Sequence, residues 1–149
     1  MRLDLTVQNA TRRRIPEPRE MRRWARAALT GLRRARAAVL VRIVDEPESA
    51  ALNSRYRGKP GPTNVLSFSY DARPADALGD IVICAPLVAR EARENNKKIK
   101  DHWAHLVVHA ILHLRGYDHQ HEPDAARMEA LETRIMRRLG IPDPYAQKL

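Results

Sequence analysis

The stretch from His109 to His119 reads H-A-I-L-H-L-R-G-Y-D-H, and it decides how the rest of the chain is interpreted. His109 and His113 are four residues apart in a segment with helical character, so their imidazoles lie on the same face of a helix. Gly116 can adopt the left-handed conformation that ends a helix, and the chain would then turn back toward that face. We therefore expect the side chain of His119 to join the first two around one point.

Three imidazoles that converge from one side leave a fourth position open, which is the arrangement of a catalytic zinc site. A structural zinc is closed by four protein ligands, usually including thiolates, and this chain has a single cysteine. The stretch therefore predicts one Zn²⁺ per chain, bound by His109, His113 and His119. Two other interpretations stay open: a solvated His-rich helix face, and an acid–base or stacking role without a metal.

The same spacing occurs in the extended zinc-protease motif H-E-x-x-H-x-x-G-x-x-H. In this chain Ala110 stands where those enzymes have the glutamate that acts as general base. The pattern keeps the metal ligands and loses the proton acceptor of peptide hydrolysis. We therefore expect a different reaction, with a zinc peptidase as one alternative.

The composition indicates a single domain, residues 1–149, with a strongly basic segment. The length is sufficient to bury an ordinary core without disulfides. The net charge is +9, and residues 11–36 alone contain ten arginines and two glutamates. Such a local excess favours an anionic partner. No apolar run has the length of a signal peptide or membrane span, so we expect a cytoplasmic protein that does not bind membranes.

Most of this basic charge falls on a predicted amphipathic helix, residues 19–35. Its apolar residues recur at helical spacing, and Arg22, Arg23 and Arg26 lie mainly off that stripe. One interpretation is a face that contacts phosphates of a nucleic acid. The other is a solvated face whose arginine stems cover the core.

Alternating and apolar patterns predict an α+β (mixed α/β) fold. The element order combines one β-α-β crossover with a hairpin, which indicates a mixed sheet of about four strands covered by about five helices. The helix that carries the His pair is apolar almost all round, so it should be the central buried helix. The predicted strands are 2–8, 37–44, 64–70 and 79–84, and the predicted helices are 19–35, 45–58, 86–96, 100–115 and 123–139.

A polar stripe runs along this otherwise apolar helix. It consists of His102, His105, His109 and His113, and a buried helix tolerates such a stripe where it lines a cavity or binds a metal. The role of His105 is open: it could contact a metal ligand without binding the metal itself, or be a core histidine bonded to a carbonyl group.

The 109–119 stretch resembles the signature of the YbeY endoribonuclease family, formerly called UPF0054. Three further segments are similar to that family and occur in the same order: L-N-S-R-Y-R-G-K-P-G-P-T-N-V-L-S-F (52–68), G-D-I-V-I-C (79–84) and M-E-A-L-E-T-R-I-M (128–136). One departure is Ala110, because the family usually has glycine directly after the first metal-binding histidine. Alanine is the better helix former, so the ligands should be unaffected.

The resemblance implies a bacterial, cytoplasmic, zinc-dependent endoribonuclease specific for single-stranded RNA. Its role would be in rRNA processing, notably maturation of the 3′ end of the small-subunit rRNA, and in ribosome quality control. The implied partners are rRNA and the ribosomal small subunit, and no DNA is expected. By position, His109, His113 and His119 would bind the metal, and Arg57 matches the family's functionally important arginine.

Several roles remain hypotheses. Arg57 could grip the scissile phosphate with two donors, or it could cap its helix. Lys59, with the helix arginines, is a candidate RNA contact. Asp118 could orient a histidine ring or stabilise the turn, and no residue is marked as general base. The non-enzymatic alternative is a ribosome-binding factor whose zinc is structural.

Overall fold

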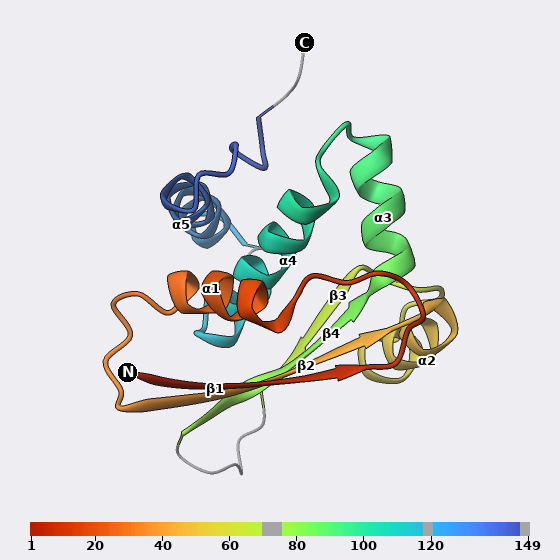
Figure 1. Cartoon of the computed structure of the whole chain (residues 1–149), viewed down its shortest axis with the longest axis horizontal. Helices are drawn as coiled ribbons and strands as arrows, with labels where there is room; N and C mark the ends of the chain where they lie inside the picture. The colour runs from red at the N-terminus through yellow and green to blue at the C-terminus, as the bar shows by residue number, and fades with distance from the viewer. Residues whose placement is uncertain (70–75, 118–120, 147–149) are drawn as a thin grey trace.

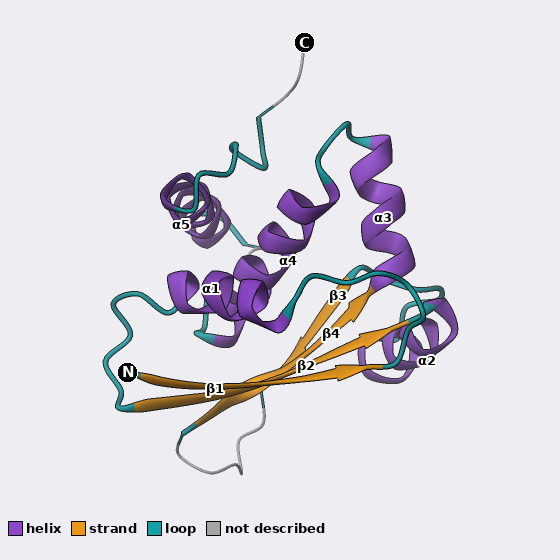
Figure 2. Ribbon diagram, in the orientation of Figure 1, coloured by secondary structure: helices purple, strands orange, loops and turns teal. Residues whose placement is uncertain are grey.

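The structure, a computed structural model, describes residues 1–69, 76–117 and 121–146. Within these residues it contains four strands and five helices in the predicted order (Figure 2). The elements are β1 (Arg2–Asn9), α1 (Pro18–Ala28), β2 (Arg36–Val44), α2 (Glu46–Arg57), β3 (Val65–Phe68), β4 (Ala77–Cys84), α3 (Ala85–Glu94), α4 (Ile99–Leu114) and α5 (Asp124–Arg138).

The strands form one mixed sheet in the order β1-β2-β4-β3. β1 and β2 are parallel, β2 and β4 are parallel, and β3 pairs with β4 in the antiparallel direction. The prediction of an α+β fold with a four-stranded mixed sheet is therefore confirmed. β3 lies at one edge of this sheet, and that position matters for the site.

Both faces of the central strands are covered. In β2, Val39, Val41 and Ile43 belong to the main hydrophobic core, whereas Val44 belongs to a smaller cluster with Leu66 of β3. Successive side chains of a strand point to opposite faces, so the main core and the smaller cluster lie on opposite sides of the sheet. Figure 1 shows α1, α4 and α5 together on one side of the sheet.

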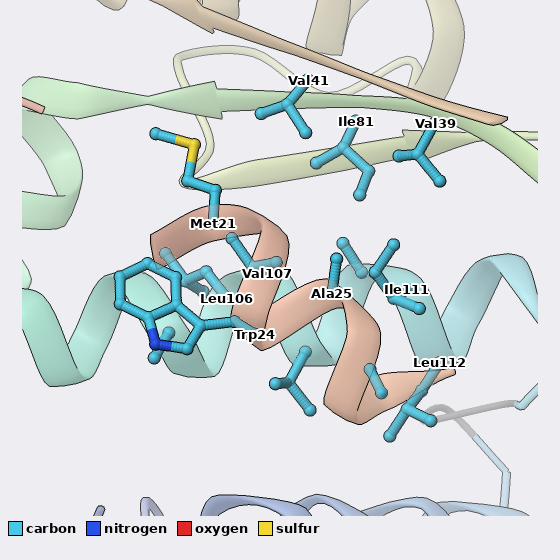
Figure 3. Packing of buried hydrophobic residues seen from close by; sticks show 14 of the residues in the cluster. Met21, Trp24, Ala25, Val39, Val41, Ile81, Leu106, Val107, Ile111 and Leu112 are labelled. Carbon is cyan, nitrogen blue, oxygen red and sulfur yellow. The ribbon is translucent and has the colours of Figure 1, made fainter. Parts of the chain in front are cut away.

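α4 is the central helix, as predicted. Val107 and Ile111 of α4 are fully buried and meet Trp24 and Ala25 of α1 under the sheet residue Val41 (Figure 3). A helix that is apolar on nearly all sides is stable only where neighbours cover all of those sides. The histidines of α4 are therefore carried on a helix with ten buried residues.

α1 is shorter than predicted, because it ends at Ala28 and not near Ala35. The Arg115 guanidinium donates hydrogen bonds to the carbonyl oxygens of Ala28 (2.8 Å) and Thr30 (3.2 Å). Without Arg115, those carbonyls would need hydrogen-bond donors from a further helical turn. Gly31 (φ 84°) then turns the chain away from the helix axis. The arginines after residue 31 therefore lie outside this helix.

Across the described ranges, no helix combines the length and apolar character needed to cross a bilayer.

Candidate functional site: a cleft between α2, β3 and α4

The carboxyl end of α4 has the turn that the sequence predicted. Gly116 has φ 102°, its N–H donates to the carbonyl of His113 (3.0 Å), and the N–H of Tyr117 donates to the carbonyl of Leu112 (3.1 Å). This pair of bonds is the Schellman motif, which requires a left-handed residue after the helix. The predicted helix end is confirmed; His119 and Asp118 lie outside the described residues.

His109 and His113 both line a cleft of about 390 Å³ between α4, β3 and the end of α2. Arg57, the last residue of α2, lines the same cleft. Arg57 is far from the two histidines in the sequence, and the fold brings the three residues to one cleft. The wall between them consists of β3 and its flanks, residues 63–68, with Tyr56 beside Arg57.

The end of α2 is held in place by buried polar side chains. Ser49 Oγ donates to the carbonyl of Thr63 (2.8 Å), and Asn53 Nδ2 donates to the carbonyl of Gly61 (2.9 Å). Gly58 takes a left-handed conformation (φ 66°) directly after Arg57. The chain therefore leaves the helix and runs back along it into β3, which fixes Arg57 at the mouth of the cleft.

Glu132 of α5 lies behind the histidines and is fully buried. Its carboxylate contacts His109 Nδ1 at 2.9 Å and His105 Nε2 at 2.6 Å, and it accepts a hydrogen bond from the Tyr145 hydroxyl at 2.7 Å. A carboxylate bonded to one ring nitrogen of a histidine fixes the tautomer and the ring orientation. The contact with Nδ1 leaves Nε2 of His109 as the ring nitrogen that can serve as a ligand in the cleft.

The electrostatics of this cluster favour a charged carboxylate. Burial alone would raise the pKa of Glu132, but hydrogen bonds from His105 and His109 outweigh it and lower the pKa to about 2. Burial lowers the pKa of His105, and burial with the nearby Glu132 charge raises the pKa of Tyr145. The buried Glu132 carboxylate is thus an anion whose neighbours donate hydrogen bonds to it.

The donor set of the site fits a metal ion. Ligand atoms of His105, His109 and Glu132 lie within 4.8 Å of one another, so this group could hold an ion. However, Glu132 already contacts both rings at hydrogen-bond distance, and metal–ligand bonds are about 2.0–2.2 Å. The contacts therefore favour Glu132 as a group that orients the His109 ring, and His113 lines the same cleft as His109.

The predicted histidine stripe divides into two parts. His102 contacts Glu91 of α3 (2.8 Å), which also accepts from Asn64 Nδ2 (3.0 Å). These two hydrogen bonds lower the pKa of Glu91, because His102 and Asn64 donate to its charged form. His102 therefore ties α4 to α3, whereas His109 and His113 face the cleft.

Three of the four predicted RNA-contact residues lie on a second surface. Arg22, Arg23 and Arg26 of α1 line a groove of about 460 Å³, together with Arg19 and, from α5, Arg138. None of the described residues that line this groove carries a carboxylate. Lys59 is exposed just after α2 and does not line either feature.

Sequence reasoning missed Glu132 and Tyr145. A signal for Glu132 was present, because it falls on the apolar stripe of α5, four residues from both Met128 and Met136, which are buried. A charge at such a position needs a buried partner. Tyr145 comes from the segment after α5, which shows no periodicity.

Comparisons with known proteins show what this chain is similar to. The sequence model of the family described as Endoribonuclease YbeY matches residues 6–140. A Methylococcus capsulatus protein named Endoribonuclease YbeY is 53% identical over 148 residues, which cover 97% of each chain. A protein of the same name from Alkalilimnicola ehrlichii is 53% identical over 151 residues, covering 96% of this chain and 91% of the relative. The solution structure of TM1509 from Thermotoga maritima has a TM-score of 0.58 at 22% identity, covers 96% of this chain and 99% of that one, and supports the fold alone.

The fold and the cleft define a class of α+β domain in which two histidines of a buried helix line the same cleft as an arginine. Within that class, the chain belongs to the YbeY endoribonuclease family. The family expected from the four sequence segments is therefore confirmed.

Proposed function

We propose that this protein is a zinc-dependent endoribonuclease specific for single-stranded RNA, formed by one domain. Its substrate is rRNA in the cytoplasm, where it acts on the small ribosomal subunit in 3′-end maturation and in ribosome quality control. The observation that carries the proposal is the shared cleft of Arg57, His109 and His113. The family membership of the chain gives the reaction class.

The proposed metal ligands are His109, His113 and His119. A bound Zn²⁺ supplies a Lewis acid for a phosphoryl oxygen and makes water a stronger acid. Glu132 holds His109 with its Nδ1 hydrogen bond, which presents Nε2 as the ligand atom. His105 acts through Glu132, to which it donates from the far side.

Arg57 has the role of binding the scissile phosphate. The guanidinium is permanently charged and can donate to two phosphate oxygens at once. It would neutralise the charge that develops on the phosphate during cleavage. Its backbone position is set by the end of α2, directly before the left-handed Gly58.

The groove of α1 and α5 supplies affinity for the RNA backbone. Its five arginines provide contacts that do not depend on sequence. The Arg23 guanidinium also donates to the Leu139 carbonyl (3.4 Å), which links α1 to the end of α5 across the groove.

The direct test is incubation of the purified, zinc-loaded protein with end-labelled single-stranded RNA and with the same RNA in a duplex. We expect internal cleavage of the single strand, and loss of cleavage after chelation and in His113→Ala. Tight binding without cleavage would favour the ribosome-binding alternative, and turnover of casein would favour a peptidase. RNA cleavage that survives both controls would contradict the proposal.

A further inference from the structure

Tyr56 is one of four large hydrophobic residues that are exposed in the described chain, and it lines the cleft of Arg57, His109 and His113. Its exposed fraction is 53%. The ring contacts Phe68 and Arg55, yet more than half of the residue stays exposed beside a polar cleft. Its place beside the proposed phosphate-binding arginine points to a ligand that is both anionic and aromatic.

The Tyr56 ring is held in position before any ligand arrives. The ring of Phe68 meets it edge to face, with centroids 5.2 Å apart and an interplanar angle of 70°. The Arg55 guanidinium lies 5.3 Å from the ring centroid. Both contacts restrict the ring, while the residue as a whole stays 53% exposed, so stacking of a base on it costs little conformational entropy.

The neighbouring strand offers hydrogen-bonding groups to the same space. Cys84 N–H donates to the Asn64 carbonyl, and the register pairs Leu66 with Val82. In an antiparallel ladder, alternate residues exchange hydrogen bonds with the partner strand. The backbone groups of Val65 and Ser67 therefore point away from β4, toward the edge of the sheet that the described strands leave open.

We propose that Tyr56 is a base-stacking residue that makes this cleft select an unpaired nucleotide. An unpaired base exposes a π-face to the ring and free edges to the backbone of β3, while Arg57 binds the adjoining phosphate. A paired base offers neither, because its face is stacked and its Watson–Crick edge is used. This inference rests on the proposed function and gives it a mechanism for strand selection.

The first test compares Tyr56→Phe with Tyr56→Leu. RNA affinity is measured by fluorescence anisotropy in chelator, where no cleavage occurs, and single-turnover cleavage is measured with zinc. We expect Tyr56→Leu to lose about 5- to 150-fold in affinity, the equivalent of one base–aromatic stack. Tyr56→Phe keeps the ring and should bind as the wild type does. The preference for single-stranded over duplex RNA should fall in Tyr56→Leu alone.

The second test varies the RNA and uses two of the same proteins. One abasic ribonucleotide is moved along the RNA, and the loss of affinity is recorded at each position for the wild type and for Tyr56→Leu. We expect one position at which the base matters for the wild type and not for Tyr56→Leu. Equal affinity of the two proteins, or identical abasic profiles, would overturn the stacking role while leaving cleavage intact. A wild type that neither binds nor cleaves RNA would overturn the proposed function and this inference together.

Discussion

Replacing Glu132 with glutamine tests the support of the proposed metal site. The substitution keeps the size of the side chain and removes the charge that His105, His109 and Tyr145 all contact. The pKa of Glu132 falls from 4.5 to about 2 in the folded protein. At ~1.4 kcal/mol per pH unit, this shift means that the folded protein stabilises the charged form relative to the neutral form by roughly 3 kcal/mol more than the unfolded chain does.

We therefore expect Glu132→Gln to lower the free energy of unfolding of the metal-free protein by about 3 kcal/mol at pH 7. For a chain of this length, that corresponds to a fall in melting temperature of roughly 6–12 °C. Because the folded-state pKa lies below the unfolded one, this contribution is present above pH ~4.5 and is lost as the pH falls toward 2. The difference between the two proteins should shrink over that range.

The assay is urea unfolding after chelation, at pH 7 and at several values below pH 4.5, with zinc titration of each folded protein at pH 7. We expect zinc affinity to fall about 10- to 100-fold in Glu132→Gln, because His109 loses the group that orients it. Glu129→Gln is the matched control, an exposed glutamate on the same helix, and should change stability by less than ~0.5 kcal/mol. If Glu132→Gln unfolds like the wild type and binds zinc equally well, the supporting role assigned to this carboxylate is wrong.

Further predictions concern other parts of the molecule. Trp24→Ala should lower the free energy of unfolding by ~3–5 kcal/mol in thermal or urea melts, because this buried ring packs against α4. Arg57→Lys should fold normally and reduce single-turnover RNA cleavage by about 10²–10³-fold, since an ammonium lacks the two-donor fork. Gly116→Ala should cost ~1 kcal/mol in the same melts, because φ 102° strains any residue with a Cβ. Replacing Arg22 and Arg26 with glutamine should weaken binding of all RNA sequences alike and reduce the salt slope by ~0.7 per lost contact, as measured by anisotropy. Unchanged salt slopes would show that the arginines of this groove do not contact the RNA.

Much of the fold could be predicted from local patterns. Alternation in β1 and the apolar runs of β2 and β4 indicated strands, and the order of elements indicated a mixed sheet. Gly116 indicated the helix end because few other residues adopt its conformation. The end of α1 was predicted too late although Gly31 was a local sign of it, and the side chain that binds the Ala28 carbonyl, Arg115, comes from 87 residues away in the sequence.

The candidate site could likewise be predicted only in part. The spacing of His109 and His113 indicated one helix face, and the resemblance pointed to Arg57. Their meeting in one cleft depends on β3 and α2, which no local pattern relates to α4. Glu132 was missed because its role depends on contacts with side chains from α4 and from the segment after α5. Its place on the apolar stripe of α5 indicated a buried charge, but no local pattern identified the residues that it contacts.

The coordination shell of bound zinc tests the central claim most directly. X-ray absorption at the zinc edge, on the protein loaded with one equivalent of zinc, should show three imidazole nitrogens and one further light ligand from solvent. The same measurement on His113→Ala should show one imidazole fewer. A shell closed by four protein ligands, or one that His113→Ala leaves unchanged, would contradict an open catalytic site in this cleft.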